Sequence, residues 1–223
     1  MVTTLYLVRH GVTVGGEERR YKGSIDVPLS DEGVAQAKKT AGFIAEELAR
    51  RTLSAEKDGC SASKLQAVYS SPLRRAQKTA EKICEPHGLS PVIHPDLRER
   101  HFGIWEGLSF SEIQERFPDE FRAWARNPVD HSPVGGETTR EVEARAVSAL
   151  SLILKLHAGH SLAVVAHGGL NRVMLCHIMG VPLEHVFRIE QDTAAVSIIE
   201  FWEEYPVIKL LNYSPAKYGE IRL

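Results

Sequence analysis

The stretch that decides the fold is residues 2–11, Val2-Thr3-Thr4-Leu5-Tyr6-Leu7-Val8-Arg9-His10-Gly11. Its first seven residues are apolar and β-branched enough to form a buried strand, and the charge begins where this strand ends. In open α/β sheets, ligands bind beyond the carboxyl ends of parallel strands, because loops there can reach inward without breaking the sheet. Arg9 and His10 are therefore candidate site residues, and the alternative is a strand end that merely becomes polar.

Composition limits the classes of function. The 223 residues are 43% hydrophobic and 25% charged, which fits a single globular domain over residues 1–223. A formal net charge of −2 gives no overall attraction to nucleic acid or to an anionic membrane, so neither is an expected partner. Neither a signal pattern nor an apolar run near the ~20 residues of a membrane span is present. Cys60, Cys84 and Cys176 show no paired spacing, which predicts free thiols in a cytoplasmic protein, with monomer and homodimer both open.

Helical and strand patterns alternate along the chain. Helices are expected from Ser30 to about Arg50, from Thr138 to about Leu156 and from Gly168 to about Met179, with an exposed connection over residues 52–64. Strands are expected at residues 2–8, 65–69, 92–93, 161–166, 187–189, 195–201 and 207–211. This alternation predicts a three-layer α/β/α sandwich, in which helices cover both faces of a mostly parallel sheet with an antiparallel edge strand.

Two adjacent arginines, Arg74 and Arg75, fall in the first turn of another predicted helix, which Ser71 would cap with Pro72 at the first position. Neighbouring helical residues point about 100° apart, so the two side chains should not share one role. Arg74 lies in line with charged residues, and Arg75 lies in line with residues that face the sheet. We expect Arg75 in the site, and two solvated arginines are the alternative.

The strand at residues 161–166 also ends in a histidine, His167, which Gly168 and Gly169 follow. Backbone amides at the start of the next helix would face an anion, and the glycines let the backbone approach closely. A lone histidine at a strand end is more often structural than catalytic. Two of them, each followed by glycine, favour one site in which neutral His10 is a nucleophile and arginine holds a phosphate.

Residues from about 101 to 137 should form a small helical cap over this crevice. Aromatic residues gather between 102 and 124, where we expect two short helices interrupted by Pro118. A small satellite core explains part of the same gathering. Glu99 precedes the cap in a dense run of basic and aromatic residues, which is not typical of packing filler. The cap side chains to consider first as substrate contacts are Arg100, His101, Trp105 and His131.

Six segments together resemble the histidine phosphatase superfamily, in its phosphoglycerate mutase-like branch. They come in family order and span nearly the whole chain, so the resemblance is more specific than any single motif. The segments are Arg9-His10-Gly11-Val12-Thr13, Ser71-Pro72-Leu73-Arg74-Arg75-Ala76-Gln77-Lys78-Thr79-Ala80, Leu97-Arg98-Glu99, Phe102-Gly103-Ile104-Trp105-Glu106-Gly107, Gly136-Glu137 and Ala166-His167-Gly168-Gly169.

The resemblance implies a chemistry for these residues. His10 would become a phosphohistidine, and Glu99 would donate a proton to the leaving group. A phosphoryl group in transfer spreads negative charge over its oxygens, so catalysis needs fixed positive partners. The groups expected to hold it are Arg9, Arg75, His167, Thr13 and the amides near Gly168. Neither a metal nor an organic cofactor is expected.

The loop after Gly11 departs from the family pattern. Relatives usually carry Glu after the Arg-His-Gly and a Trp-Asn pair further on, whereas this chain has Val12 and Gly15-Gly16. The asparagine would ordinarily add a contact to the phosphate. We expect the backbone amides of Gly15 and Gly16, or Thr13, to fill its place.

The expected function is a metal-independent phosphomonoesterase that hydrolyses a small phosphorylated metabolite. Glu99-Arg100-His101 resembles the mutase version of that segment, so a cofactor-dependent phosphoglycerate mutase is the alternative, although the long mutase cap insertion is absent. A catalytically silent phosphate-binding protein is the third hypothesis. The cap should select among the substrates of related phosphatases, which include α-ribazole phosphate, phosphoserine, sugar phosphates and phosphoglycerates.

Overall fold

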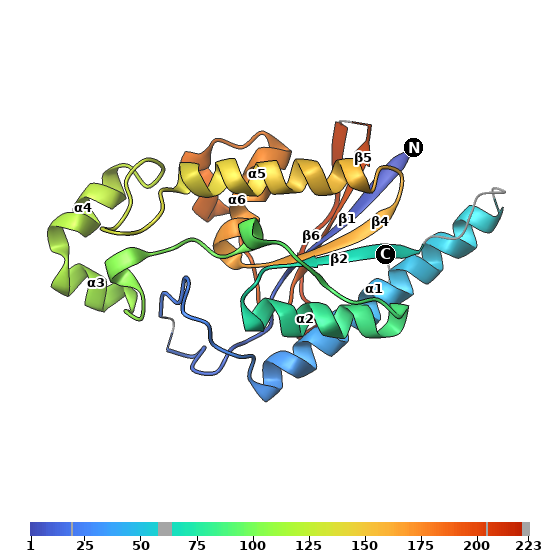
Figure 1. The fold of residues 1–223 in the computed structure, drawn as a ribbon, viewed down its shortest axis with the longest axis horizontal. Helices are drawn as coiled ribbons and strands as arrows, with labels where there is room; N and C mark the ends of the chain where they lie inside the picture. The colour runs from blue at the N-terminus through green and yellow to red at the C-terminus, as the bar shows by residue number, and fades with distance from the viewer. Residues whose placement is uncertain (19, 58–63, 204, 220–223) are drawn as a thin grey trace.

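A six-stranded sheet forms the centre of the computed structural model, which describes residues 1–18, 20–57, 64–203 and 205–219. The strands are β1 (Val2–Arg9), β2 (Leu65–Ser70), β3 (Val92–Ile93), β4 (Ser161–Ala166), β5 (Val196–Trp202) and β6 (Tyr205–Tyr213). Their order across the sheet is β3-β2-β4-β1-β5-β6 (Figure 1). Neighbours among β1 to β4 pair in parallel, and β5 pairs antiparallel with both β1 and β6. The prediction of a mostly parallel sheet is confirmed. The antiparallel strand is β5, which lies next to the edge strand β6 and is not itself at the edge.

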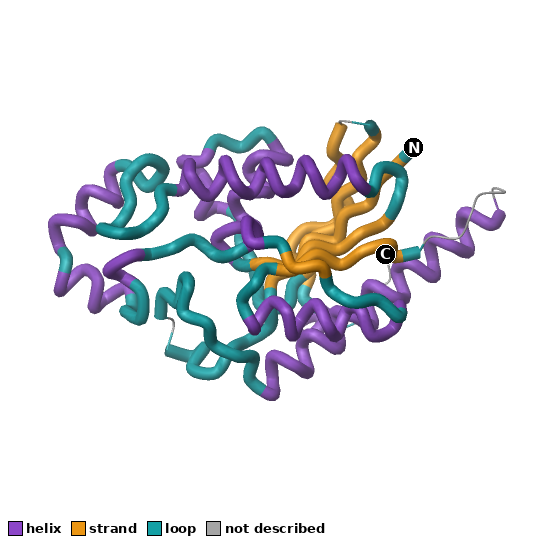
Figure 2. The backbone as a smooth tube through the Cα atoms, viewed as in Figure 1, coloured by secondary structure: helices purple, strands orange, loops and turns teal. Residues whose placement is uncertain are grey.

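Helices cover both faces of the sheet (Figure 2). The longer helices are α1 (Asp31–Lys57), α2 (Arg74–Cys84), α5 (Thr139–Leu156) and α6 (Gly168–Met179). Short ones are η1 (Glu85–His87), η2 (Pro95–Leu97), η3 (Gly103–Trp105), η4 (Leu183–Arg188) and α7 (Pro215–Tyr218). Tyr6 and Val8 pack in the core with α1 and α2, and Leu5 and Leu7 pack in the core with α5 and α6. Alternate side chains of β1 thus serve both cores, and the three-layer prediction is confirmed.

Between β3 and β4 the chain leaves the sheet and forms two short helices, α3 (Phe110–Arg116) and α4 (Pro118–Arg126). They lie at the end of the molecule drawn on the left in Figure 1, with Pro118 at the start of the second helix as predicted. The rings of Trp105 and Trp124 are 5.7 Å apart between centroids. Aromatic side chains therefore form a small separate core in this segment, as the sequence predicted.

Two helix boundaries differ from the sequence prediction. α1 continues to Lys57, because residues 51–57 contain neither glycine nor proline, so the exposed connection does not begin at residue 52. α2 begins at Arg74 and not at Pro72, since the Ser71 hydroxyl contacts His167 and the Asp26 carboxylate accepts the Arg74 amide at 2.8 Å. A carboxylate from another segment thus serves this helix end.

The strand predicted at residues 187–189 is wrong. Phe187 and Arg188 belong to η4, and Ile189 directly follows it. Within η4, Leu183 and Val186 lie three residues apart and are both buried. Side chains three residues apart share one face of a 3-10 helix, and here that face packs toward α6. Cys84 and Cys176 are free and buried, whereas Cys60 lies outside the described residues.

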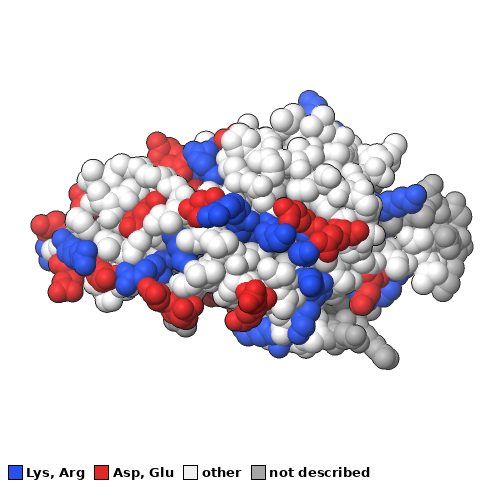
Figure 3. Space-filling view, turned by 60° about the horizontal axis from the view of Figure 1, so that its bottom comes forward, with Lys and Arg blue, Asp and Glu red and all other residues white. Residues whose placement is uncertain are grey.

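Charged side chains of both signs are mixed on the face drawn in Figure 3. Among the described residues, no helix has both the length and the apolar character required to cross a membrane. The expectation that neither nucleic acid nor a membrane is a partner stays a prediction.

Gly33 lies in the first turn of α1, where the loop after His10 touches this helix. A Cβ at Gly33 would lie 1.9 Å from the Val12 carbonyl oxygen, which cannot withdraw without moving the loop. We predict that Gly33→Ala lowers the free energy of unfolding by about 1–3 kcal/mol. Gly42→Ala, in the same helix with nothing within 4 Å of the added Cβ, should instead raise it by about 0.5–1 kcal/mol. Urea titrations measure both changes, and equal effects would contradict the close approach.

Candidate active site

The two strand-end histidines lie side by side at the carboxyl edge of the sheet. β1 and β4 pair so that Arg9 lies beside Ala166, which brings the next residues, His10 and His167, together. Their ring centroids are 5.1 Å apart. His10 is 8% exposed and His167 is fully buried. The structure therefore brings together the pair that the sequence placed at two separate strand ends.

The hydrogen bond of His10 determines which ring nitrogen is free. Its Nδ1 lies 2.7 Å from the Gly11 carbonyl oxygen, and because a carbonyl only accepts, Nδ1 carries the proton. Nε2 therefore keeps its lone pair. Burial, and then the charges of Arg9 and Arg75, hold the pKa of His10 well below its usual range. His10 is thus a neutral imidazole at neutral pH, which is the form a nucleophile requires.

His167 is fixed through both of its nitrogens. The Arg75 Nε donates to its Nδ1 at 3.3 Å, so the proton resides on Nε2, which donates to the Ser71 Oγ at 2.7 Å. Burial, and then the charges of His10 and Arg75, hold the pKa of His167 well below its usual range. The sequence predicted Ser71 as a helix cap and did not indicate this contact, because His167 lies 96 residues further along the chain.

The two adjacent arginines of α2 have separate surroundings, as the helical-face argument predicted. Arg75 is 2% exposed and donates to the carbonyls of Ile25 and Gly23, both at 2.8 Å. The side chain of Arg74 is 64% exposed and forms an ion pair with Asp26 at 3.0 Å. Burial lowers the pKa of Arg75. Arg75 is therefore the one that faces the histidines.

Arg9 brings a second guanidinium to the site. Its Nη1 donates to the Gln191 carbonyl at 2.5 Å, while its buried Nε has no partner among the described residues. A Cβ at Gly168 would lie 3.2 Å from that Nε, so the glycine lets the arginine lie against the start of α6. Burial lowers the pKa of Arg9. An unpaired, buried N–H of this kind is a ready donor for an anion.

The Glu99 carboxylate lies at the start of α6, where the sequence predicted that a bound anion would lie. Its Oε2 accepts from the Gly169 amide at 3.1 Å, and its Oε1 accepts from the amides of Leu170 at 3.1 Å and Arg100 at 2.9 Å. A negative charge is favourable at the start of a helix. The expectation that these amides face the ligand directly is thus corrected, because two of them donate to Glu99, the residue predicted to be the proton donor.

The loop after His10 also differs from expectation. The Gly16 amide donates to the Thr13 carbonyl at 2.9 Å, so a turn within the loop uses it. The Thr13 hydroxyl accepts from Lys22 Nζ at 2.6 Å, and the Val14 carbonyl accepts from the same nitrogen at 2.9 Å. Lys22 was missed, because the irregular segment around it has no period from which a direction can be inferred.

One cavity of about 910 Å³ is lined by Arg9, His10, Arg75 and Glu99, whereas His167 is not among its lining residues. The predicted cap residues Arg100 and Trp105 line it, whereas His101 and His131 do not. The His101 side chain is 43% exposed, and His131 pairs with Glu120 at 3.3 Å. The cavity lining also includes Thr13, Lys22, Gly168, Arg172, Phe110, Trp124 and Phe187. The cap thus contributes aromatic surface and one buried arginine.

Comparison with known proteins gives a family and several relatives. The family model described as the histidine phosphatase superfamily (branch 1) matches residues 5–214. Phosphoserine phosphatase 1 of Hydrogenobacter thermophilus is 33% identical over 208 residues, which cover 93% of this chain and 91% of the relative. The metal-independent phosphoserine phosphatase of Arabidopsis thaliana is 36% identical over 79% of this chain and 69% of its own length. The solved structure of Bacillus stearothermophilus YhfR is 30% identical, with a TM-score of 0.79 and coverage of 93% and 96%.

The two buried histidines predict a fold that weakens in acid. Their pKa values lie well below 6.5 in the folded chain, so below about pH 6.5 the unfolded chain binds more protons. The free energy of unfolding must then fall as the pH drops. In His167→Asn the slope against pH should decrease by about 1.4 kcal/mol per pH unit, whereas His177→Asn, at an exposed position of α6, should keep it. Urea titrations between pH 5 and 7.5 in phosphate-free buffer measure the slopes, and an unchanged slope in His167→Asn would contradict the prediction.

Proposed function

The chain belongs to the histidine phosphatase superfamily and is a phosphatase, and we propose that it hydrolyses a small phosphomonoester through a phosphohistidine on His10. The observation that carries this proposal is the neutral His10, whose Nε2 is free of a proton in a cavity that Arg9 and Arg75 also line. A neutral nucleophile among fixed cations is what attack on a phosphate dianion requires. In the proposed reaction no metal takes part.

In the first step the His10 Nε2 lone pair forms a bond to phosphorus, and the bond from phosphorus to the leaving oxygen breaks. Glu99 gives its proton to that oxygen, so a neutral alcohol departs. In the second step water attacks the phosphohistidine, Glu99 takes a proton from that water, and the nitrogen–phosphorus bond breaks to release inorganic phosphate. Glu99 is then ready to donate again.

The positive groups around His10 hold the phosphoryl oxygens during both steps. Arg9 and Arg75 supply guanidinium donors, and His167 orients Arg75, because the Arg75 Nε donates to the His167 Nδ1 at 3.3 Å. Lys22 takes the place of the family asparagine, because its ammonium is held beside Thr13 and its charge acts on His10. Because the Gly16 amide already donates within the loop, the lysine replaces its expected role, and Thr13 positions the lysine.

We propose further that the substrate alcohol carries a second anionic group, such as a carboxylate. Arg9, Lys22, Arg75 and Arg100 line the cavity, and in the described part of the chain none of them forms an ion pair with a carboxylate. Buried cations without counterions are costly until an anion arrives. Because Glu99 is protonated in the proposed first step, a phosphate dianion balances two of these four positive charges and two stay unbalanced. The phosphoserine phosphatases among the relatives support a substrate of this class.

The covalent step is tested by labelling. Incubation with a ³²P-labelled phosphomonoester followed by rapid quenching should yield a protein-bound label that is stable in alkali and lost in acid, as expected for a phosphoramidate. His10→Ala should abolish the label and lower turnover at least about 10³-fold, because it removes the nucleophile. His177→Ala, at an exposed position, should keep both. A label that persists in His10→Ala would refute the proposal.

The substrate class is tested with a matched pair of esters. Phosphoserine and phosphoethanolamine share the ammonium group and the phosphate, and only the first has a carboxylate. We expect kcat/KM to be about 10–100-fold higher for phosphoserine, which corresponds to one charged hydrogen bond. Assays without added metal measure the ratio. Equal values for the two esters would show that no cation in the cavity binds a carboxylate.

A further inference from the structure

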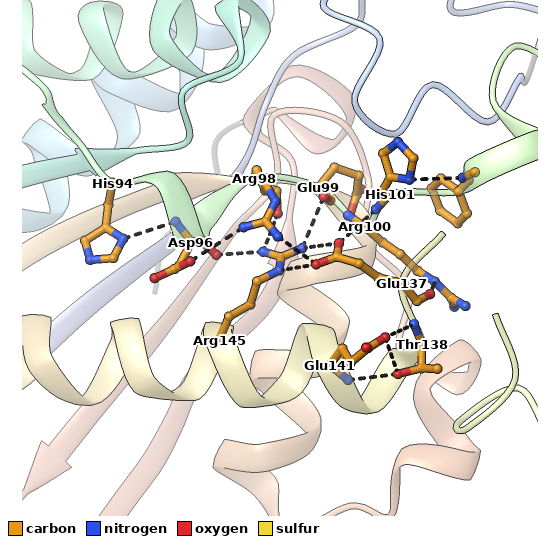
Figure 4. A network of polar contacts seen from close by, with 12 residues as sticks. His94, Asp96, Arg98, Glu99, Arg100, His101, Glu137, Thr138, Glu141 and Arg145 are labelled. Atoms are coloured by element: carbon orange, nitrogen blue, oxygen red, sulfur yellow. Dashed lines mark hydrogen bonds and ion pairs between the residues drawn. The ribbon is translucent and has the colours of Figure 1, made fainter. Parts of the chain in front are cut away.

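Arg145 of α5 lies behind Glu99 and donates every N–H of its guanidinium group (Figure 4). Nε and Nη2 each donate to the Glu137 carboxylate at 2.9 Å. Nη1 donates to the carbonyls of Asp96 at 2.7 Å and Arg98 at 2.8 Å, and Nη2 also donates to the Glu99 carbonyl at 3.1 Å. The side chain is only 10% exposed. One guanidinium therefore holds three carbonyls of the segment that carries the proposed proton donor.

That segment has little other backbone support. β3 ends at Ile93, and the chain then passes through η2 to Glu99 outside the sheet. Carbonyl groups that leave a sheet and are removed from water need another donor. Arg145 is that donor, so its side chain binds the backbone carbonyls of this segment, as the amides of a neighbouring strand bind those of β1.

Glu137 keeps Arg145 in place. Its carboxylate also accepts from the His101 amide at 2.9 Å and from Arg98 Nη2 at 2.8 Å. Burial raises the pKa of Glu137, but the hydrogen bonds from Arg145 and from the His101 amide outweigh burial, so the pKa is lowered overall. A bidentate pair between a carboxylate and a guanidinium fixes direction as well as distance. The pair therefore sets the position of the guanidinium relative to the loop.

Glu99 is thus held from two sides. Its carbonyl is bound by Arg145, while its carboxylate is bound by the amides of Gly169 and Leu170 at the start of α6. α5 and α6 pack against each other, so both sets of contacts come from one rigid layer. A displacement of the backbone at Glu99 would move the carboxyl group relative to His10 without changing any residue in contact with the phosphate.

We infer that Arg145, oriented by Glu137, is the positioning residue that aligns Glu99 with the leaving oxygen. This inference rests on the proposed function, in which Glu99 protonates the departing alcohol. Loss of Arg145 should then impair substrates in proportion to their need for that proton. A role in stability alone would impair all substrates alike.

Phenyl phosphate and p-nitrophenyl phosphate distinguish these roles, because they match in shape but only the p-nitrophenolate leaves readily without a proton. The quantity to measure is kcat/KM, since it covers the steps through departure of the first leaving group. In Arg145→Met we expect a loss of about 30-fold or more for phenyl phosphate and of less than about 3-fold for p-nitrophenyl phosphate. Arg145→Lys, which keeps the charge but lacks the planar fork, should show a smaller loss with the same selectivity.

Two further variants complete the test. Arg98→Met removes the other cation on Glu137, at a side chain that is 41% exposed, and should leave the ratio of the two substrates unchanged. Glu99→Gln should reproduce the selective loss. Equal losses for both substrates in the Arg145 variants, or no loss, would overturn the inference, and Arg145→Lys decides it if Arg145→Met does not fold. Absence of hydrolysis or of a phosphoenzyme in the wild type, or an unselective Glu99→Gln, would instead refute the proposed function.

Discussion

The parallel pairing of β1 with β4 is the constraint on which the rest of the structure depends. Its register puts Arg9 beside Ala166, so that His10 and His167 leave the sheet together. A shift by one residue would turn every side chain of a strand to the opposite face. Because Leu5 and Leu7 are buried with one pair of helices and Tyr6 and Val8 with the other, both cores oppose such a shift.

Burial then determines which groups in the candidate active site carry charge. Burial is the largest of the causes that lower the pKa of both arginines and both histidines. Arg9 and Arg75 still keep their protons, because guanidinium is so weakly acidic, whereas His10 and His167 lose theirs. Positive charge is therefore carried by groups that cannot attack phosphorus, and the group that can attack stays neutral. In the proposed function, a phosphate dianion supplies the counterion that this arrangement lacks.

The parts of the site that could be predicted from the sequence are those set by local geometry. The ends of β1 and β4 and the angle between neighbouring residues of α2 are enough to select His10, His167 and Arg75. Other contacts join distant segments and leave no local pattern. The three carbonyls that Arg145 binds lie 46 to 49 residues away, and Ser71 and His167 are separated by 96 residues. Tertiary contacts of this kind also moved the start of α2 away from its expected cap.

The proposed nucleophile and the proposed proton donor depend on different kinds of support. His10 follows a central strand, so changes outside the sheet hardly reach it. Glu99 follows a two-residue edge strand and is continuous with Arg100, which lines the cavity and donates to the Glu137 carbonyl. If a different cap sequence displaced Arg100, the pair of Glu137 and Arg145 would therefore have to take up that displacement, or the proposed proton donor would move. In the proposed mechanism, substrate selection by the cap and proton transfer would thus be coupled through one ion pair, whereas phosphoryl binding at the sheet edge would not.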